Sequence, residues 1–111
     1  MAPRTPEPIS YHAALVAQSL ASGHAYGFDL MRATGLPSGT VYPLLRRLEA
    51  AGLVRSEWED IDAEREGRPR RRYYALTAAG RKSLAAALPR LRAQWQIFGV
   101  VGDGDAGAPA R

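Results

Sequence analysis

Cysteine is absent from this chain of 111 residues, and long apolar runs are missing as well. Without cysteine, disulfides and thiolate metal sites are excluded, so the reducing cytoplasm is the default expectation. The first eight residues contain three prolines, and no segment is apolar enough for a signal peptide or a membrane span. We therefore expect a soluble cytoplasmic protein that does not contact membranes.

Patterns typical of enzymes are also missing. His12 and His24 lie outside any metal-ligand spacing, and no acidic residue forms a recognisable pair with either of them. No glycine-rich phosphate loop follows a predicted strand. We therefore predict no metal, no cofactor and no catalytic activity.

Lysine occurs only once, at Lys82, so the formal net charge of +4 depends on arginine. The planar guanidinium group matches phosphate oxygens and the edge of guanine, which a lysine point charge does not. This balance favours a polyanionic partner. An arginine-rich proteome would give an enzyme the same bias, so the placement of the arginines carries more information than their number.

The length predicts one folded domain with a modest core. Residues 1–8 and 99–111 are rich in proline or in small residues, and we expect a disordered arm and tail there. Between them, Ile9, Ala13, Val16 and Leu20 fall on one stripe of a first helix that ends near residues 22–23. Residues 25–34 predict a short second helix, which Gly35 closes.

Ser38 is the predicted N-cap of a third helix. The inward face of this helix carries Val41, Leu44, Leu45 and Leu48 at helical spacing, and its outer face is polar. Pro43 falls so early that its cost to the helix should be small. A short helix, a tight turn and a helix with a polar outer face form a helix-turn-helix, which would place the third helix in a major groove.

Residues 53–58 and 71–76 predict two antiparallel strands joined by a long polar connection, which is a wing. Its tip and outgoing limb are basic, whereas residues 57–66 hold six carboxylates and one arginine, a local charge of −5. Two interpretations of the acidic limb stay open. Either it pairs loosely with the wing arginines at the surface, or it competes with phosphate for them and limits non-specific binding.

Thr77 is expected to cap a last helix whose apolar residues recur at spacings of four and three. Pro89 should kink or interrupt that helix. Such a seam is too apolar to face water on a small protein, so we predict a homodimer. The predicted dimer interface is Leu88, Leu91, Trp95 and Phe98. Burial in the chain's own core is the alternative for Leu84 and Leu88.

The predicted fold class is therefore α+β and mostly helical, a winged helix-turn-helix of order α-α-α-β-β-α with a C-terminal dimerisation helix. Residues 9–80 would form the DNA-binding domain, and residues 81–98 the dimerisation helix. Two segments within this framework, taken together, are specific enough to indicate a protein family. They are Ser38-Gly39-Thr40-Val41-Tyr42-Pro43 and Arg72-Tyr73-Tyr74-Ala75-Leu76-Thr77-Ala78-Ala79-Gly80.

On these segments the sequence resembles the PadR family of repressors, over about two-thirds of the chain from Ala13 to Leu84. The resemblance implies a homodimer that binds a palindromic operator in double-stranded DNA and often releases it when a small aromatic effector arrives. Transferred position by position, the DNA-binding residues are Ser38, Thr40, Tyr42, Arg46, Arg47, Arg68 and Arg70.

Other interpretations stay open for several of these residues. Arg46 and Arg47 could form an ordinary solvated helix face, and the Tyr42 ring could pack between helices. Tyr26 and Gly27 are expected to pack rather than to contact DNA. Trp95 resembles, by its place on the last helix, a tryptophan that lines an effector pocket in some multidrug-binding members. The alternative function is a winged-helix protein-interaction module without specific DNA binding.

Overall fold

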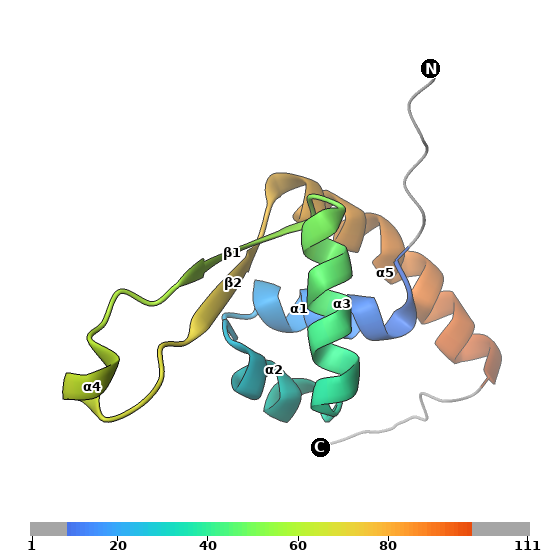
Figure 1. Cartoon of the computed structure of the whole chain (residues 1–111). Helices are drawn as coiled ribbons and strands as arrows, with labels where there is room; N and C mark the ends of the chain where they lie inside the picture. The colour runs from blue at the N-terminus through green and yellow to red at the C-terminus, as the bar shows by residue number, and fades with distance from the viewer. Residues whose placement is uncertain (1–8, 99–111) are drawn as a thin grey trace.

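The computed structural model describes residues 9–98, with the backbone alone for 94–98, and it confirms the mostly helical winged-helix architecture (Figure 1). The predicted arm and tail lie outside the described residues. The elements are α1 (Tyr11–Ala21), α2 (Gly27–Thr34), α3 (Ser38–Ala50), β1 (Val54–Trp58), α4 (Ala63–Glu66), β2 (Arg72–Leu76) and α5 (Ala78–Phe98). The one-turn helix α4 at the tip of the wing is the only one of these elements that the sequence did not predict.

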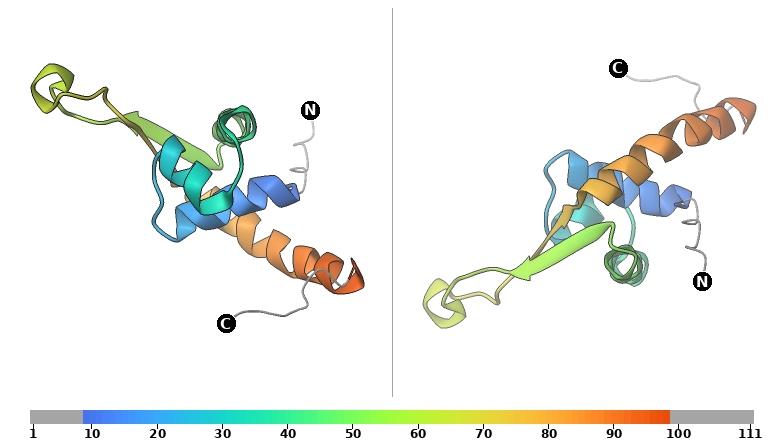
Figure 2. Two further views of the ribbon diagram at one scale, coloured as in Figure 1. Left: turned by 90° about the horizontal axis from the view of Figure 1, so that it is seen from below. Right: turned by 90° about the horizontal axis from the view of Figure 1, so that it is seen from above.

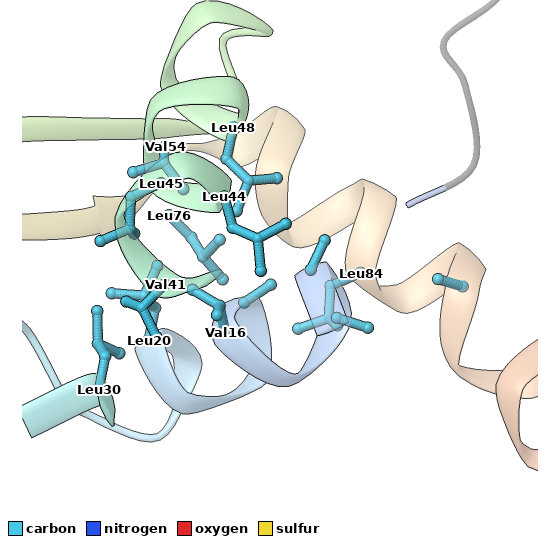
Figure 3. Close-up of a cluster of buried hydrophobic side chains, with 14 of the residues drawn as sticks. Val16, Leu20, Leu30, Val41, Leu44, Leu45, Leu48, Val54, Leu76 and Leu84 are labelled. Atoms are coloured by element: carbon cyan, nitrogen blue, oxygen red, sulfur yellow. The ribbon is translucent and has the colours of Figure 1, made fainter. Parts of the chain in front are cut away.

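The core lies between the first three helices, the base of the hairpin and the first half of α5 (Figure 3). Val16, Leu30, Val41 and Leu45 are completely buried, one or two from each of the first three helices. Each such side chain stabilises the fold by about 1.5–3 kcal/mol through the apolar surface that it removes from water. This packing holds α2 and α3 at a fixed angle to the wing.

The ends of the helices follow the predicted caps in one case and depart from them in another. Thr77 Oγ1 accepts from the Gly80 amide at 3.0 Å, as expected of a cap. Ser38, in contrast, is the first residue within α3, and Pro37 occupies the N-cap position in extended backbone. The Pro37 carbonyl accepts from the amides of Thr40 and Val41. The Ser38 hydroxyl is therefore not used as a cap and lies on the exposed surface.

The wing is an antiparallel hairpin in which Val54 pairs with Leu76 at the base and Trp58 pairs with Arg72 toward the tip. Cross-strand partners share a face, so Trp58 and Arg72 lie on the same face as the buried Val54 and Leu76. The hairpin and the far end of α5 extend to opposite sides of the helical core (Figure 2). The wing and the far end of α5 can therefore contact different partners.

Pro89 does not interrupt α5, which runs without a break from Ala78 to Phe98, so of the two expected effects, a kink or an interruption, the interruption does not occur. Pro89 and Ala85 lie on the outer side of the helix, and the carbonyl that proline leaves without a donor can face water. Among the described residues, no helix is long and apolar enough to cross a membrane.

The apolar seam of α5 is divided between the core and the surface. Leu91 is only 4% exposed within a single chain, and Leu84 is similarly buried. The sequence assigns Leu91 to the dimer interface, but its side chain already belongs to the core of its own chain, next to the buried face of α1. Leu88 is half-buried and keeps part of its surface available. The side chains of Trp95 and Phe98 lie outside the described residues.

Candidate nucleic-acid interface

The outer face of α3 presents polar and charged side chains to solvent. Ser38, Tyr42, Arg46 and Arg47 are exposed, and Thr40 is half-buried. In the part of the chain that the structure describes, the side chains of Arg46 and Arg47 form no hydrogen bond and no ion pair. A guanidinium group without a partner is free to bind phosphate or the edge of a base. Ser38, Tyr42 and Arg46, spaced four residues apart, form one stripe of α3, whereas Thr40 and Arg47 lie on the other flank of its outer side.

Tyr42 packs against the start of α2. A Cβ on Gly27 would collide with the Tyr42 hydroxyl and ring, so the tyrosine occupies space that only a glycine leaves open. The Tyr42 side chain is nevertheless 38% exposed. This geometry shows why Tyr42 and Gly27 occur together, and it leaves part of the ring accessible one helical turn before Arg46.

A polar junction links the end of α3 to the base of the wing. Ser56 Oγ donates to Glu49 Oε2 at 2.7 Å, and Arg72 Nε donates to Ser56 Oγ at 2.9 Å. The Arg72 guanidinium also lies 3.7 Å from Glu49 Oε1 and 5.4 Å from the centre of the Trp58 ring. Burial raises the pKa of Tyr74 beside this junction. The junction fixes the direction of the wing relative to α3.

A second cluster forms around Glu59, which directly follows β1. Arg68 donates through Nη1 and Nη2 to the two Glu59 oxygens at 2.7 and 2.9 Å, and the Glu59 side chain is only 14% exposed. The Arg71 amide and the Tyr73 hydroxyl donate to Glu59 at 3.2 and 3.1 Å. The hydrogen bonds from Arg68, followed by those from Arg71 and Tyr73, lower the pKa of Glu59 from 4.5 to about 2.

Glu59→Gln should destabilise the protein at neutral pH, because glutamine cannot accept the paired charge-assisted hydrogen bonds. The folded state holds the carboxylate at a depressed pKa, so its contribution is complete above about pH 4.5 and disappears as the pH falls toward 2. The difference in unfolding free energy between variant and wild type should therefore shrink over that interval. Urea unfolding at several pH values measures it.

Glu57→Gln is the matched control. Glu57 is exposed and lies two residues before Glu59, and its substitution removes the same charge. It should leave the unfolding free energy nearly unchanged at every pH. Equal effects of the two substitutions would show that the Glu59 cluster does not stabilise the wing.

The remaining arginines of the wing have different surroundings. Arg70 is exposed and donates through Nε to the Ile61 carbonyl at 3.0 Å. The Arg71 guanidinium lies 4.4 Å from the centre of the Tyr26 ring, which itself contacts Tyr73 edge to face. Neither arginine has a carboxylate partner among the described residues. The two arginines that the sequence predicted for the wing, Arg68 and Arg70, therefore differ, because only the charge of Arg68 is neutralised by a carboxylate.

The wing, α2 and α3 border a common groove with a volume of about 710 Å³. Of the sequence-predicted DNA-binding residues, Tyr42 of α3 and Arg68 and Arg70 of the wing line this groove. Its lining does not include Ser38, Thr40, Arg46 or Arg47. Its full lining is Tyr26, Gly27, Phe28, Asp29, Arg32, Tyr42, Trp58, Arg68, Pro69, Arg70, Arg71, Arg72 and Tyr74. We refer to this feature as the wing groove.

The histidines require one correction. The sequence predicts no acidic partner for His24, but its Nδ1 lies 3.1 Å from Asp29 Oδ2 in the first turn of α2. The two residues are five positions apart and are joined by a loop, so helical or strand spacing could not predict their contact. No group of three or more potential metal ligands occurs among residues 9–98, and the His24–Asp29 pair acts as a local contact at the start of α2.

Comparison with known protein families gives one decisive match. Residues 18–86, from α1 into α5, match the model of the transcriptional regulator PadR-like family. The chain belongs to the PadR-like family. It is therefore a transcriptional regulator and not an enzyme, as the sequence predicted. A comparison with curated proteins found no significant match.

Solved structures similar to this PadR-like chain agree with the assignment. A PadR family regulator from Clostridium difficile is 25% identical with a TM-score of 0.62, covering 81% of this chain and 92% of that one. Bordetella bronchiseptica BpsR, studied for regulation of its DNA binding by 6-hydroxynicotinic acid, is 21% identical with a TM-score of 0.68. The alignment with BpsR covers 79% of this chain but only 59% of BpsR, and at this identity it shows the fold alone.

A third solved structure is a mutant of MepR from S. aureus, bound to an oligodeoxyribonucleotide. It is 21% identical with a TM-score of 0.62, and the alignment covers 83% of this chain and 64% of MepR. This similarity too shows the fold alone.

Sequence reasoning missed two groups of residues at the interface. In the sequence, Glu59 is only one charge of an acidic limb, and its pairing with Arg68 arises from a contact across the hairpin. Phe28 and Trp58 were not singled out, although both are exposed and line the wing groove. The position of Trp58 on β1, four residues after the buried Val54, was the available signal for its side of the sheet.

Proposed function

We propose that this protein is a repressor that binds a palindromic operator in double-stranded DNA as a homodimer. The observation that carries the proposal is the wing groove, because α3 and the arginine-bearing wing border it together. DNA contact requires these two elements to face the same way. The cytoplasm, where such DNA is accessible, is the proposed location.

In this proposal α3 enters the major groove and the wing contacts the backbone. The side chains of Arg46 and Arg47 have no ion-pair partner among the described residues, which favours contact with bases or phosphates. Ser38, Thr40 and Tyr42 would contact the DNA from the first turns of the same helix. Arg70 would bind phosphate from the wing, whereas Arg68, held by Glu59, would support the shape of the wing.

Residues 9–80 would act as the DNA-binding domain and residues 81–98 as the dimerisation helix, although α5 itself begins at Ala78. Leu88 is the described residue of the seam that keeps an exposed part, and Trp95 and Phe98 would extend the interface. Light scattering tests the dimer, with a mass twice the 12.0 kDa of one chain as the expected result. A monomeric mass at the concentrations that bind DNA would exclude this arrangement.

A small aromatic effector near Trp95 is a further part of the proposal. Its support is the position of Trp95 on α5 and the regulation of BpsR, a protein of the same fold, by 6-hydroxynicotinic acid. Titration of planar aromatic acids should change the tryptophan fluorescence and weaken DNA binding. If neither indole responds, this effector site does not exist.

The test of DNA binding is its dependence on salt. A footprint on the DNA upstream of the protein's own gene would provide the operator. Arginines that neutralise phosphates release counterions, so affinity for that operator should fall by about 10³-fold or more between about 50 and 200 mM salt. Binding that is absent, or insensitive to salt, would favour the protein-interaction module instead.

A further inference from the structure

Three large aromatic side chains are exposed on the walls of the wing groove. Phe28 is 60% exposed, Trp58 is 58% exposed and Tyr42 is 38% exposed, and they come from α2, β1 and α3. Of the large hydrophobic side chains that are exposed among the described residues, only Tyr11 lies elsewhere. Exposed apolar surface that gathers at one concave site marks a place where something binds.

The same walls are strongly basic. Five arginines line the groove, whereas Asp29 is its one acidic residue and is paired with His24. Glu59 neutralises the charge of Arg68, and Glu49 neutralises part of the charge of Arg72. Arg32, Arg70 and Arg71 have no carboxylate partner within residues 9–98. The occupant of the groove should therefore carry negative charge next to apolar rings.

A sugar–phosphate chain has this composition. Its phosphates suit arginine, and the apolar face of a deoxyribose ring suits contact with an aromatic side chain. Paired bases inside a duplex cannot reach such a groove, but the backbone of one strand can enter it. The position of the groove between the proposed major-groove helix and the wing is where that strand would pass.

We propose that the wing groove holds the backbone of one DNA strand, with phosphates at Arg70 and Arg71 and deoxyribose rings against Trp58 and Phe28. This inference rests on the proposed function. It assigns to two aromatic residues a contact that does not depend on base sequence. Trp58 is positioned for it by Arg72, whose guanidinium lies over the ring and is held by Ser56 and Glu49.

The test uses the fluorescence of Trp58. The chain has two tryptophans, so the signal of Trp58 is obtained as the difference between the wild type and Trp58→Phe, which leaves Trp95 in place. Acrylamide should quench it strongly in the free protein, because the side chain is 58% exposed. Saturation with operator duplex should reduce the quenching at least about twofold, and random duplex should do the same at a concentration that saturates the protein, since backbone contacts carry no sequence information.

Affinity measurements complete the test. Trp58→Ala should weaken binding to operator and to random duplex about equally, by about tenfold, and Phe28→Ala should act in the same direction. Trp58→Phe should keep most of the affinity because a ring remains. Arg55→Ala is the control, since Arg55 is exposed on the face of β1 opposite to Trp58, and its loss should change binding less than about twofold.

The outcomes separate this inference from the proposed function. If operator binding is normal and steeply salt-dependent but Trp58 stays fully quenchable and Trp58→Ala binds as well as wild type, the backbone site is wrong and the repressor proposal stands. If the wild-type chain binds no DNA, both fail. Protection of Trp58 by the mononucleotide dTMP as strong as that by duplex would also overturn the assignment, because it would indicate a pocket for free nucleotides.

Discussion

We expect Gly80→Ala to lower the melting temperature by about 10–20 °C, the shift that corresponds to about 2–3 kcal/mol in a domain of this size. Gly80 is buried in the first turn of α5, where its amide donates to Thr77. A Cβ there would collide with the Leu53 carbonyl oxygen, which is backbone and cannot rotate away. The Leu53 carbonyl also accepts from the Thr77 amide. Relief of the clash would therefore separate α5 from the base of the wing.

Gly39→Ala is the control for this prediction. Gly39 lies in the first turn of α3, and a Cβ there would meet no atom within 4 Å. Alanine should leave the melting temperature unchanged or raise it by a few degrees, because alanine favours a helix over glycine. Thermal unfolding followed by circular dichroism measures both variants. Equal melting temperatures of Gly80→Ala and wild type would contradict the packing of α5 against Leu53.

Most of the fold could be predicted from the sequence because its signals are local. The stripe that includes Val16 and Leu20, the inward face of α3 and the Thr77 cap each depend on residues within a few positions of one another. The prediction of the Ser38 cap failed because Pro37, with its fixed φ, took the N-cap position instead. Pro89 does not interrupt α5 because the cost of a proline is small where the unpaired carbonyl can face water.

The candidate site was predictable only in part, because its decisive contacts join distant residues. The polar face of α3 follows from helical periodicity alone. The Glu59–Arg68 pair spans nine residues across the wing tip, and the contact of Arg71 with Tyr26 joins the wing to α2. Neither contact can be predicted from sequence spacing. Of the two interpretations of the acidic limb, loose pairing at the surface does not describe Glu59, which accepts two hydrogen bonds from Arg68.

Arg46→Ala and Arg70→Ala should weaken DNA binding in different ways. Arg46 lies on α3 with no partner among residues 9–98, so it can contact base edges, and its loss should cost about 1–3 kcal/mol on the operator and less on random DNA. Arg70 lies on the wing, where Nε is bound to the Ile61 carbonyl and the terminal nitrogens remain available for phosphate. Its loss should weaken binding to every sequence about equally.

The measurement is the ratio of dissociation constants on random and operator duplexes at one salt concentration, for wild type and both variants. Arg46→Ala should lower that ratio. Arg70→Ala should preserve it while the salt slope falls by about one unit for the phosphate that is no longer neutralised. Arg55→Ala serves again as the control for removal of one positive charge. If the two variants change the ratio identically, then α3 and the wing do not divide base recognition and backbone binding between them. If Arg46→Ala leaves the ratio unaltered, other residues of α3 must recognise the base sequence.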